Sequence, residues 1–269
     1  MYNESKKHRD SSESEELRES LRKFLKSNRE KLLFFIPKLF DEEKADAILK
    51  RGYVEEKEGE FLAGRKETPS EVLKLIAETP ELYQHYSVKA ALAKNPKTPI
   101  GISKTLLGFL LKRDLYKLTI SREIPAGLRK SSIDILQKKL PEIPRGEKIS
   151  MAKTAPRDLL LALLSDKEPM VLETALWNPR LTELDIITLI QRKTTDSASL
   201  EIIATHKKWK NRYQVRLFLV KNPKTLPFTA SSLLENFLRQ DLEILLANKE
   251  ISEKLKIEIS RQLKIKLTS

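Results

Sequence analysis

Cations and aromatic residues are mixed in one short stretch of the chain, and this mixture is its clearest candidate for binding chemistry. Within residues 206–216 stand His206, Lys207, Lys208, Trp209, Lys210, Arg212, Tyr213 and Arg216. A surface that contacts phosphates and stacks on bases needs both kinds of side chain. Trp209 and Tyr213 can equally be packing residues, in which case the lysines between them form a solvated turn. Both interpretations remain open.

Other residues with reactive side chains offer weaker signals. Asp114 and Asp241 could be taken for paired carboxylates, but they are equivalent positions of a repeated segment, where we expect each to cap a helix. Trp177 is expected to pack against neighbouring helices. The three histidines are scattered and the chain has no cysteine, which excludes thiolate metal sites. We therefore predict a protein that is not an enzyme, with no catalytic residue, metal or cofactor.

The charge of the chain is strongly basic and unevenly distributed. The 269 residues include 51 Lys+Arg and 38 Asp+Glu, a net charge of +13. Residues 1–80 contain 17 basic and 18 acidic residues, so the excess follows residue 80. Such an excess suits an anionic partner such as nucleic acid, although lysine-rich helix faces can also simply solvate a helical protein. Only seven glycines are present, which argues against glycine-rich phosphate loops and a turn-rich β fold.

The N-terminal part of the chain is predicted to be helical but separate from the rest. Residues 1–13 are polar and are expected to be a disordered tail. Helices are expected from Ser14 and over 31–40 and 41–51, followed by an acidic, glycine-containing loop over 52–66. The first apolar run, residues 32–36, is too short to span a membrane. We expect no membrane span and a cytoplasmic protein.

The remainder of the chain predicts an all-α domain over residues 67–269. Apolar residues recur at i, i+3 and i+4, and strand-like alternation is nearly absent. Thr68, Thr98 and Thr182 each stand where a helix N-cap is expected, the first two directly before proline. An N-terminal helical region with its acidic loop, residues 14–66, would precede this domain.

An internal duplication is the strongest pattern in the sequence. Residues 82–140 align without a gap with residues 209–267, and 20 of the 59 positions are identical. The segment Lys94-Asn95-Pro96-Lys97-Thr98 recurs as Lys221-Asn222-Pro223-Lys224-Thr225. Each proline disfavours helical geometry in the residue before it, so a helix should end near Asn95 and near Asn222. A third Asn-Pro pair begins at Asn178, 44 residues before Asn222, a spacing typical of helical-hairpin repeats.

With its short helix pairs, this period and the segment VLETALWNPRLTELDI at residues 171–186, the chain resembles bacterial HEAT-like repeat proteins. The resemblance covers residues 67–269 and implies a right-handed α-solenoid that presents a surface to a macromolecular partner. The iron–sulfur cluster of the related leucine-rich repeat variants cannot transfer, because cysteine is absent. The architecture is also similar to that of alkylpurine DNA glycosylases, but their active-site residues have no match here.

Basic residues at repeat-equivalent positions, together with the cluster described above, define the candidate binding surface. Equivalent positions of a solenoid line one face, so these side chains could follow a phosphate backbone, or they could simply be exposed positions that stayed polar. We expect a protein partner, with nucleic acid as the alternative and no small-molecule ligand. The candidate residues are Lys89, Lys94, Lys97, Lys112, Arg122, Arg129, Lys207, Lys208, Lys210, Arg212, Arg216, Lys221, Lys224, Arg239, Lys249 and Lys256.

Overall fold

The described part of the protein consists of helices and the loops that join them. The structure, a computed structural model, describes residues 54–268, with side chains up to Lys264. Within these residues it contains helices α4 to α19, two short 3-10 helices and no strand. The predicted all-α class is therefore confirmed for this part of the chain. The tail predicted at 1–13 and the helices predicted within 14–51 lie outside the described residues.

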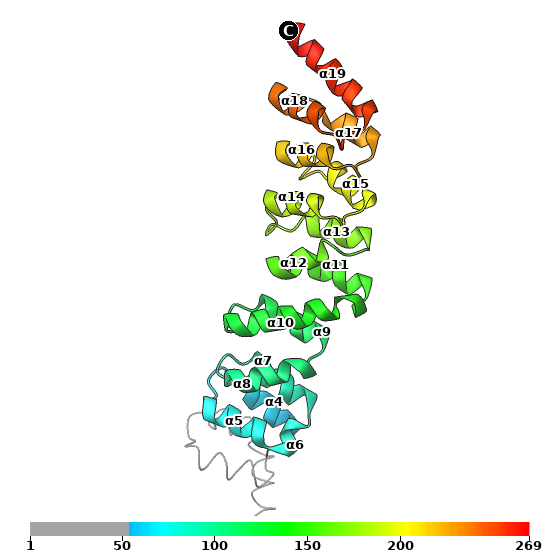
Figure 1. The fold of residues 1–269 in the computed structure, drawn as a ribbon. Coiled ribbons are helices and arrows are strands. Elements are labelled where there is room, and N and C mark those ends of the chain that lie inside the picture. The colour runs from blue at the N-terminus through cyan, green and yellow to red at the C-terminus, as the bar shows by residue number, and fades with distance from the viewer. Residues whose placement is uncertain (1–53, 269) are drawn as a thin grey trace, which may run out of the picture. The chain divides into compact units, whose positions relative to one another are not determined.

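The chain divides into two compact units, of which the first ends at Ile135 and the second begins at Leu136. Unit 1 contains α4 (Glu56–Gly64), α5 (Ser70–Glu78), α6 (Pro80–Tyr83), α7 (Tyr86–Lys94), α8 (Ile100–Leu106) and α9 (Lys112–Ile120) (Figure 1). Helix α10 (Ala126–Lys139) contains the division. Unit 2 contains α11 (Arg145–Thr154), α12 (Arg157–Leu163), α13 (Pro169–Leu176), α14 (Glu183–Gln191), α15 (Ser197–Thr205), α16 (Tyr213–Lys221), α17 (Pro227–Leu233), α18 (Arg239–Ala247) and α19 (Glu253–Thr268).

Helix α4 corrects the sequence prediction, which assigned residues 52–66 to a loop. The glycines and glutamates that suggested a loop are compatible with this helix, because Gly59 and the glutamates of the first turn each have a role in it. A Cβ atom on Gly59 would lie 3.0 Å from Leu82 Cδ2, so the glycine allows α4 to pack closely against its neighbours, chiefly α7. Glu56 and Glu58 lie in the first turn, where the helix dipole stabilises negative charge.

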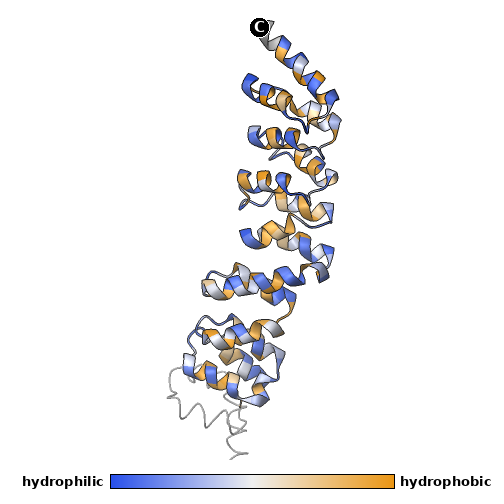
Figure 2. Cartoon of the chain, viewed as in Figure 1, coloured by the Kyte–Doolittle hydropathy of each residue, from blue (hydrophilic) through white to orange (hydrophobic). Residues whose placement is uncertain are grey.

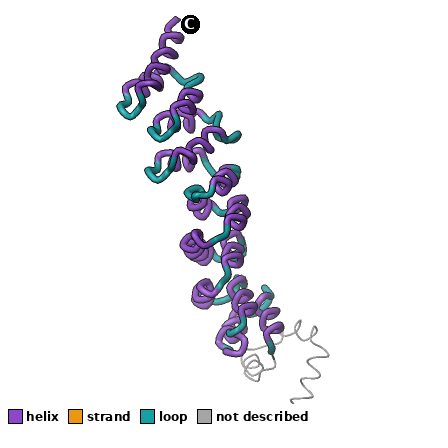
Figure 3. The backbone as a smooth tube through the Cα atoms, turned by 90° about the vertical axis from the view of Figure 1, so that its right-hand side faces the viewer, coloured by secondary structure: helices purple, strands orange, loops and turns teal. Residues whose placement is uncertain are grey.

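In unit 2 several helices pack on the helix two places before them in the chain, whereas α18 packs on α19. Helix α13 packs on α11, α15 on α13, α17 on α15 and α19 on α17, while α16 packs on α14. Figure 3 shows short loops joining successive helices. Figure 2 shows that the helices of this unit carry both hydrophobic and hydrophilic residues. The apolar positions include the buried side chains of Leu160, Leu172, Ile186, Leu200 and Leu219, which form the core between the packed helices.

The helix boundaries follow the sequence duplication residue by residue. Helices α7, α8 and α9 begin and end 127 residues before α16, α17 and α18. The same shift relates α4 to α14 and α5 to α15, a segment where identical residues are sparser but include Leu62/Leu189, Arg65/Arg192 and Thr68/Thr195. The repeated segment therefore begins at Glu56, well before the residues that align clearly in sequence. Residues 56–139 are called copy 1 and residues 183–266 copy 2.

The asparagine of each Asn-Pro pair connects two helices that are stacked on each other. Asn95 is buried; its Nδ2 donates to the carbonyl oxygens of Ala63 and Arg65 at 2.7 and 2.8 Å, and its Oδ1 accepts from the Lys97 amide. In copy 2, Asn222 Nδ2 donates to the Ile190 carbonyl at 2.6 Å. The Nδ2 bonds of the two asparagines satisfy carbonyls at the end of the preceding stacked helix, which have no partner inside that helix. The predicted ends of α7 and α16 near these asparagines are confirmed.

The threonines predicted to be N-caps behave in two different ways. Thr182 caps α14 with its side-chain oxygen, as predicted. For Thr68 and Thr98 the prediction is wrong, because the N-caps of α5 and α8 are the following prolines. These buried hydroxyls instead donate to carbonyls six residues earlier, those of Leu62 and Leu92 at 2.6 and 2.7 Å. Each threonine therefore closes the preceding helix rather than opening the next.

Candidate binding groove

Four of the sixteen cations of the candidate surface bind main-chain carbonyls at helix ends or in the loops beside them. Arg129 donates to Ser121 and Ile124, Arg216 to Leu233 and Glu235, Lys224 to Lys193 and Thr195, and Lys208 to Asn178. The last carbonyls of a helix carry partial negative charge and lack an internal partner. These four side chains therefore stabilise the helix packing within their own unit.

Other candidate cations contact side chains nearby. Lys94 pairs with Asp114 at 2.7 Å, Arg239 with Glu243 at 2.9 Å and Lys256 with Glu253 at 2.8 Å, whereas Lys89 lies over the rings of Tyr83 and Phe109 and Lys221 over that of Phe218. Lys112 is half-buried, and Lys97, Arg122, Lys207, Lys210, Arg212 and Lys249 are exposed. Cations at repeated positions thus contribute mainly to the internal framework of each unit.

The mixed cluster at residues 206–216 is largely a packing element. Trp209 is 2 % exposed, and its Nε1 donates to the Leu176 carbonyl at 2.9 Å, which confirms the packing interpretation for this residue. Burial lowers the pKa of Lys208, whose ammonium lies over the Trp209 ring at 4.5 Å from its centroid. Lys207 and Lys210 remain exposed in the turn before α16.

Asp114 connects two stacked helices and does not cap one, which corrects the sequence prediction. Helix α9 begins at Lys112 with Leu111 as its N-cap, so Asp114 lies inside the first turn. Its carboxylate is buried and accepts hydrogen bonds from Tyr86 Oη at 2.6 Å and Lys94 Nζ at 2.7 Å. Burial alone would raise the pKa of Asp114, but these two donors outweigh it and hold the pKa below its ordinary value.

The same connection recurs twice in unit 2. Tyr213 Oη donates to Asp241, which lies inside α18 and likewise is not its N-cap. Between the two copies, Arg157 takes the place of the tyrosine, and its Nη2 donates to Asp185 at 2.6 Å. In all three cases the donor is the first residue of its helix, and the aspartate, 28 residues later, is the third residue of its own. This is a structural repeat, in which each aspartate has its own donor on the stacked helix.

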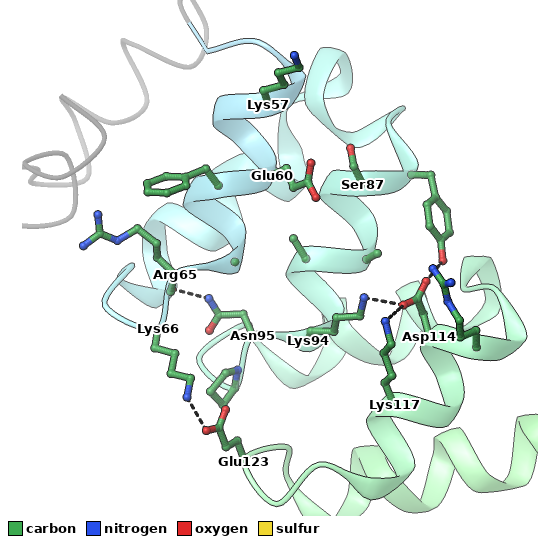
Figure 4. Close-up of a pocket in the computed structure, with 17 residues that line it drawn as sticks. Lys57, Glu60, Arg65, Lys66, Ser87, Lys94, Asn95, Asp114, Lys117 and Glu123 are labelled. Carbon is green, nitrogen blue, oxygen red and sulfur yellow. Dashed lines mark hydrogen bonds and ion pairs between the residues drawn. The ribbon is translucent and has the colours of Figure 1, made fainter. Parts of the chain in front are cut away.

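An open groove of about 840 Å³ lies in unit 1 along α4, α7 and the start of α9 (Figure 4). Small side chains on α7, Ala90 and Ala91, leave it room. One end is bordered by the Asp114 connection and another by an ion pair between Lys66 and Glu123. The charged side chains along the groove are those of Lys57, Glu60, Arg65, Lys66, Lys94, Arg113, Asp114, Lys117 and Glu123.

Positive charge dominates the groove after its internal pairs are counted. Asp114 and Glu123 are paired with lysines from the groove itself, which leaves Glu60 as the remaining carboxylate. Lys57 and Arg113 are exposed, and within residues 54–268 neither makes an ion pair or side-chain hydrogen bond. Lys117 lies 3.6 Å from an Asp114 oxygen that Lys94 already occupies. Within the described residues Lys57 and Arg113 are thus unpaired and Lys117 shares one carboxylate with Lys94, so all three can contact an anionic ligand.

Sequence reasoning identified Lys94 but missed most of the groove. Lys57, Arg113 and Lys117 correspond to Leu184, Gln240 and Ile244 in copy 2, so a search for cations at repeated positions passes over them. The signal that points to them is the opposite one, a charge present in one copy and absent from the other. It becomes interpretable once the fold shows that α4, α7 and α9 border one hollow.

A smaller hollow of about 390 Å³ lies beside α13 in unit 2 and is bordered by Trp177, Lys153 and Glu173. Trp177 is 53 % exposed, so the prediction that it is packed is wrong. Its ring lies against the His206 ring at an interplanar angle of 57°, with 4.5 Å between the ring centroids. Burial lowers the pKa of His206, whose Nε2 has no hydrogen-bond partner in the described part of the chain.

Neither hollow contains the ligand set of a metal ion. Among the described residues, no three histidine or carboxylate side chains gather closely enough to hold one. None of the helices described is both long and apolar enough to cross a bilayer. The groove is therefore best described by its charge and shape, as a cationic hollow with a small apolar floor. Comparison of the chain with protein-family models, with curated proteins and with solved structures gave no match.

Proposed function

We propose that this chain is a non-enzymatic binding protein that holds another protein on a HEAT-like helical-repeat surface. The observation that carries the proposal is the groove of unit 1, which combines an apolar floor on α7 with three available cations. Protein interfaces combine apolar and polar contacts in this way. The uniform shift of helix boundaries and the regular packing order in unit 2 support the solenoid interpretation.

Nucleic acid is the weaker candidate because of how the repeated cations are used. A surface that follows a phosphate backbone needs a series of free lysine and arginine side chains. Here Arg129, Arg216 and Lys224 bind main-chain carbonyls, and Trp209, the most obvious stacking residue, is buried. Other candidate cations, among them Lys97 and Arg212, are exposed, but it is at the groove that three cations surround one hollow.

Site-specific photo-crosslinking in cells tests the proposal. A photoreactive amino acid at Ala91, on the groove floor, is compared with the same residue at Lys104, an exposed position of α8 that does not border the groove. We expect discrete protein adducts from position 91 that resist nuclease treatment, and none from position 104. Adducts that nuclease removes would replace the proposal with nucleic-acid binding, and equal adducts at both positions would refute a groove-directed partner.

A salt titration provides an independent test in purified solution. Labelled duplex and single-stranded DNA and RNA are mixed with the full chain at about 50 mM salt and above. We expect no saturable binding. Measurable affinity that weakens steeply with salt would instead show that the basic residues contact phosphates, and would contradict the proposed preference for protein.

A further inference from the structure

We propose, on the basis of the proposed protein-binding function, that the groove of unit 1 accepts a short acidic segment of the partner. The carboxylates of this segment would contact Lys57, Arg113 and Lys117, and a small apolar side chain between them would lie over Ala91. The proposal specifies the chemistry of the partner at one defined place in the fold, and it follows from the charges and packing of the groove.

Three cations of the groove already have partners within the protein. Lys94 and Lys66 are neutralised by Asp114 and Glu123, and Arg65 is hydrogen-bonded to Glu67 at 3.4 Å. The exposed Lys57 and Arg113 have no such partner within residues 54–268, and Lys117 has only a share of Asp114. Like charges held around one hollow repel one another, and an acidic ligand relieves that repulsion.

The floor of the groove favours a peptide over a nucleic acid. Base stacking needs an accessible aromatic face. The Phe61 ring is 45 % exposed but has the Arg65 guanidinium over it, 5.5 Å from the centroid. Tyr86 is 37 % exposed, and its hydroxyl is bound to Asp114 and to the Leu111 amide. The groove also has the aliphatic surface of α7 around Ala91, which suits a small side chain flanked by carboxylates.

Copy 2 supplies a natural set of substitutions for the test. At the equivalent positions it has Gln240 for Arg113, Ile244 for Lys117 and Phe218 for Ala91, and its helices have the same boundaries. Arg113→Gln, Lys117→Ile and Ala91→Phe are therefore expected to preserve the fold. Lys104→Gln removes one positive charge from unit 1 outside the groove and serves as the control for loss of charge away from the site.

The experiment measures binding of a fluorescent peptide of repeated Glu-Glu-Ala to the full chain by anisotropy. A peptide of repeated Gln-Gln-Ala controls for charge, and a single-stranded DNA of equal charge controls for polyanion binding. We expect Arg113→Gln combined with Lys117→Ile to weaken binding of the acidic peptide about tenfold. Ala91→Phe should weaken it several-fold by filling the floor, and Lys104→Gln should leave it within about twofold. Circular dichroism verifies that each variant is folded.

One substitution is expected to act in the opposite direction. Glu60→Gln removes the remaining carboxylate of the groove and should tighten binding of the acidic peptide about twofold to threefold. A rise in affinity cannot be produced by damage to the fold, so this variant separates a specific electrostatic effect from a structural one.

The outcomes distinguish the acidic-segment proposal from the broader function. If the acidic and neutral peptides bind equally, or if no variant differs from Lys104→Gln, the acidic segment is refuted. Protein adducts at position 91 would still support partner binding in that case. If the single-stranded DNA binds more tightly than the acidic peptide and shows the same variant pattern, the groove is a nucleic-acid site and both proposals fail.

Discussion

The two copies of the repeated segment share five helices with matching boundaries but have very different surfaces. In copy 1, Ala91 leaves the groove open and Lys57, Arg113 and Lys117 surround it. In copy 2 the corresponding residues are Phe218, Leu184, Gln240 and Ile244, of which Leu184 and Ile244 are exposed apolar side chains. The positions that join the helices, in contrast, are retained, including the asparagines before proline and the tyrosine–aspartate pairs.

This difference separates residues that build the repeat from residues that give one copy its own surface. Asn95 and Asn222, which recur at the same position, contact the equivalent neighbouring helix in each copy. A side chain that differs is free to serve a ligand. In a duplicated protein, asymmetry between the copies is therefore better evidence of a binding site than repetition, and the following predictions test that rule.

Removing the side chain of the asparagine that precedes proline should have the largest effect on stability, and this effect should be greater in copy 1. Asn95→Ala removes a buried bond to the Ala63 carbonyl and two half-buried bonds, to the Arg65 carbonyl and from the Lys97 amide, which we expect to cost about 2–3 kcal/mol of unfolding free energy. Asn222→Ala should cost about 1 kcal/mol, because Asn222 is more exposed and Lys224 also binds carbonyls of the same loop.

Chemical denaturation measures the two costs, and hydrogen exchange locates them. Faster exchange should be confined to α4 and α7 in the first variant and to α14 and α16 in the second. Asn248→Ala is the matched control, because its side chain accepts one bond from the exposed Glu250 amide. Equal costs for Asn95→Ala and Asn248→Ala would show that the buried carbonyls do not depend on the asparagine.

The helices of the described region were predictable wherever proline and apolar spacing acted together. Pro96 and Pro223 fixed the ends of α7 and α16, and Pro169 fixed the start of α13. Helix α4 was missed because its glycines are unfavourable in isolation, and only the contact of Gly59 with Leu82 shows why one is needed. Thr68 and Thr98 were misassigned because a threonine between two helices can serve either one, and the choice depends on which carbonyl is buried beside it.

Removing the repeated lysine, Lys94 or Lys221, should have the second-largest effect on stability, and this effect should again be greater in copy 1. Lys94→Met takes away a donor that lies 2.7 Å from the buried Asp114 carboxylate, and we expect a loss of about 1–2 kcal/mol, since Tyr86 remains as a donor. Lys221→Met should change stability by less than about 0.5 kcal/mol, because Lys221 lies over the Phe218 ring. Urea denaturation of both variants at neutral pH measures the difference.

The pH dependence of stability provides a second test of the two lysine variants. The pKa of Asp114 is lowered in the folded protein, so its contribution is present above the unfolded value of about 3.9 and is lost as the pH falls through the folded pKa. Lys94→Met should weaken that acid dependence, whereas Lys221→Met should leave it unchanged. Identical acid unfolding curves for the Lys94 variant and the parent protein would contradict a lysine-stabilised Asp114.

The groove itself was only partly predictable from the sequence. The basic excess after residue 80 suggested an anionic partner, and Lys94 was among the expected residues. Arg113 and Lys117 are ordinary surface cations until α9 is placed beside α7, because their relation to Lys57 depends on tertiary packing over more than fifty residues. Trp177 was expected to pack since it precedes a helix break, but that position faces solvent and only its contact with His206 is internal.

The smallest expected effect comes from His206, which stands in copy 2 where copy 1 has Thr79. Both residues are buried. Thr79 donates to the Leu75 carbonyl at 2.8 Å, whereas His206 Nδ1 accepts from the Lys208 amide at 3.3 Å and its Nε2 has no partner among the described residues. Burial lowers the pKa of His206; Glu173 opposes this shift and the Lys208 ammonium adds to it. The neutral ring is therefore the form that the folded protein accommodates.

Because the pKa of His206 is lower in the folded protein than in the unfolded chain, the unfolded chain binds the proton more readily. Stability from His206 is thus present above the unfolded value of about 6.5 and is lost as the pH falls from there through the folded pKa. His206→Thr, which copies the residue of copy 1, should remove this loss and leave the acid dependence from Asp114 and Asp185 at lower pH. Urea denaturation between about pH 8 and pH 5 measures the difference between variant and parent. If that difference is the same at both ends of the range, His206 does not titrate on unfolding, and the two copies do not differ in their response to pH.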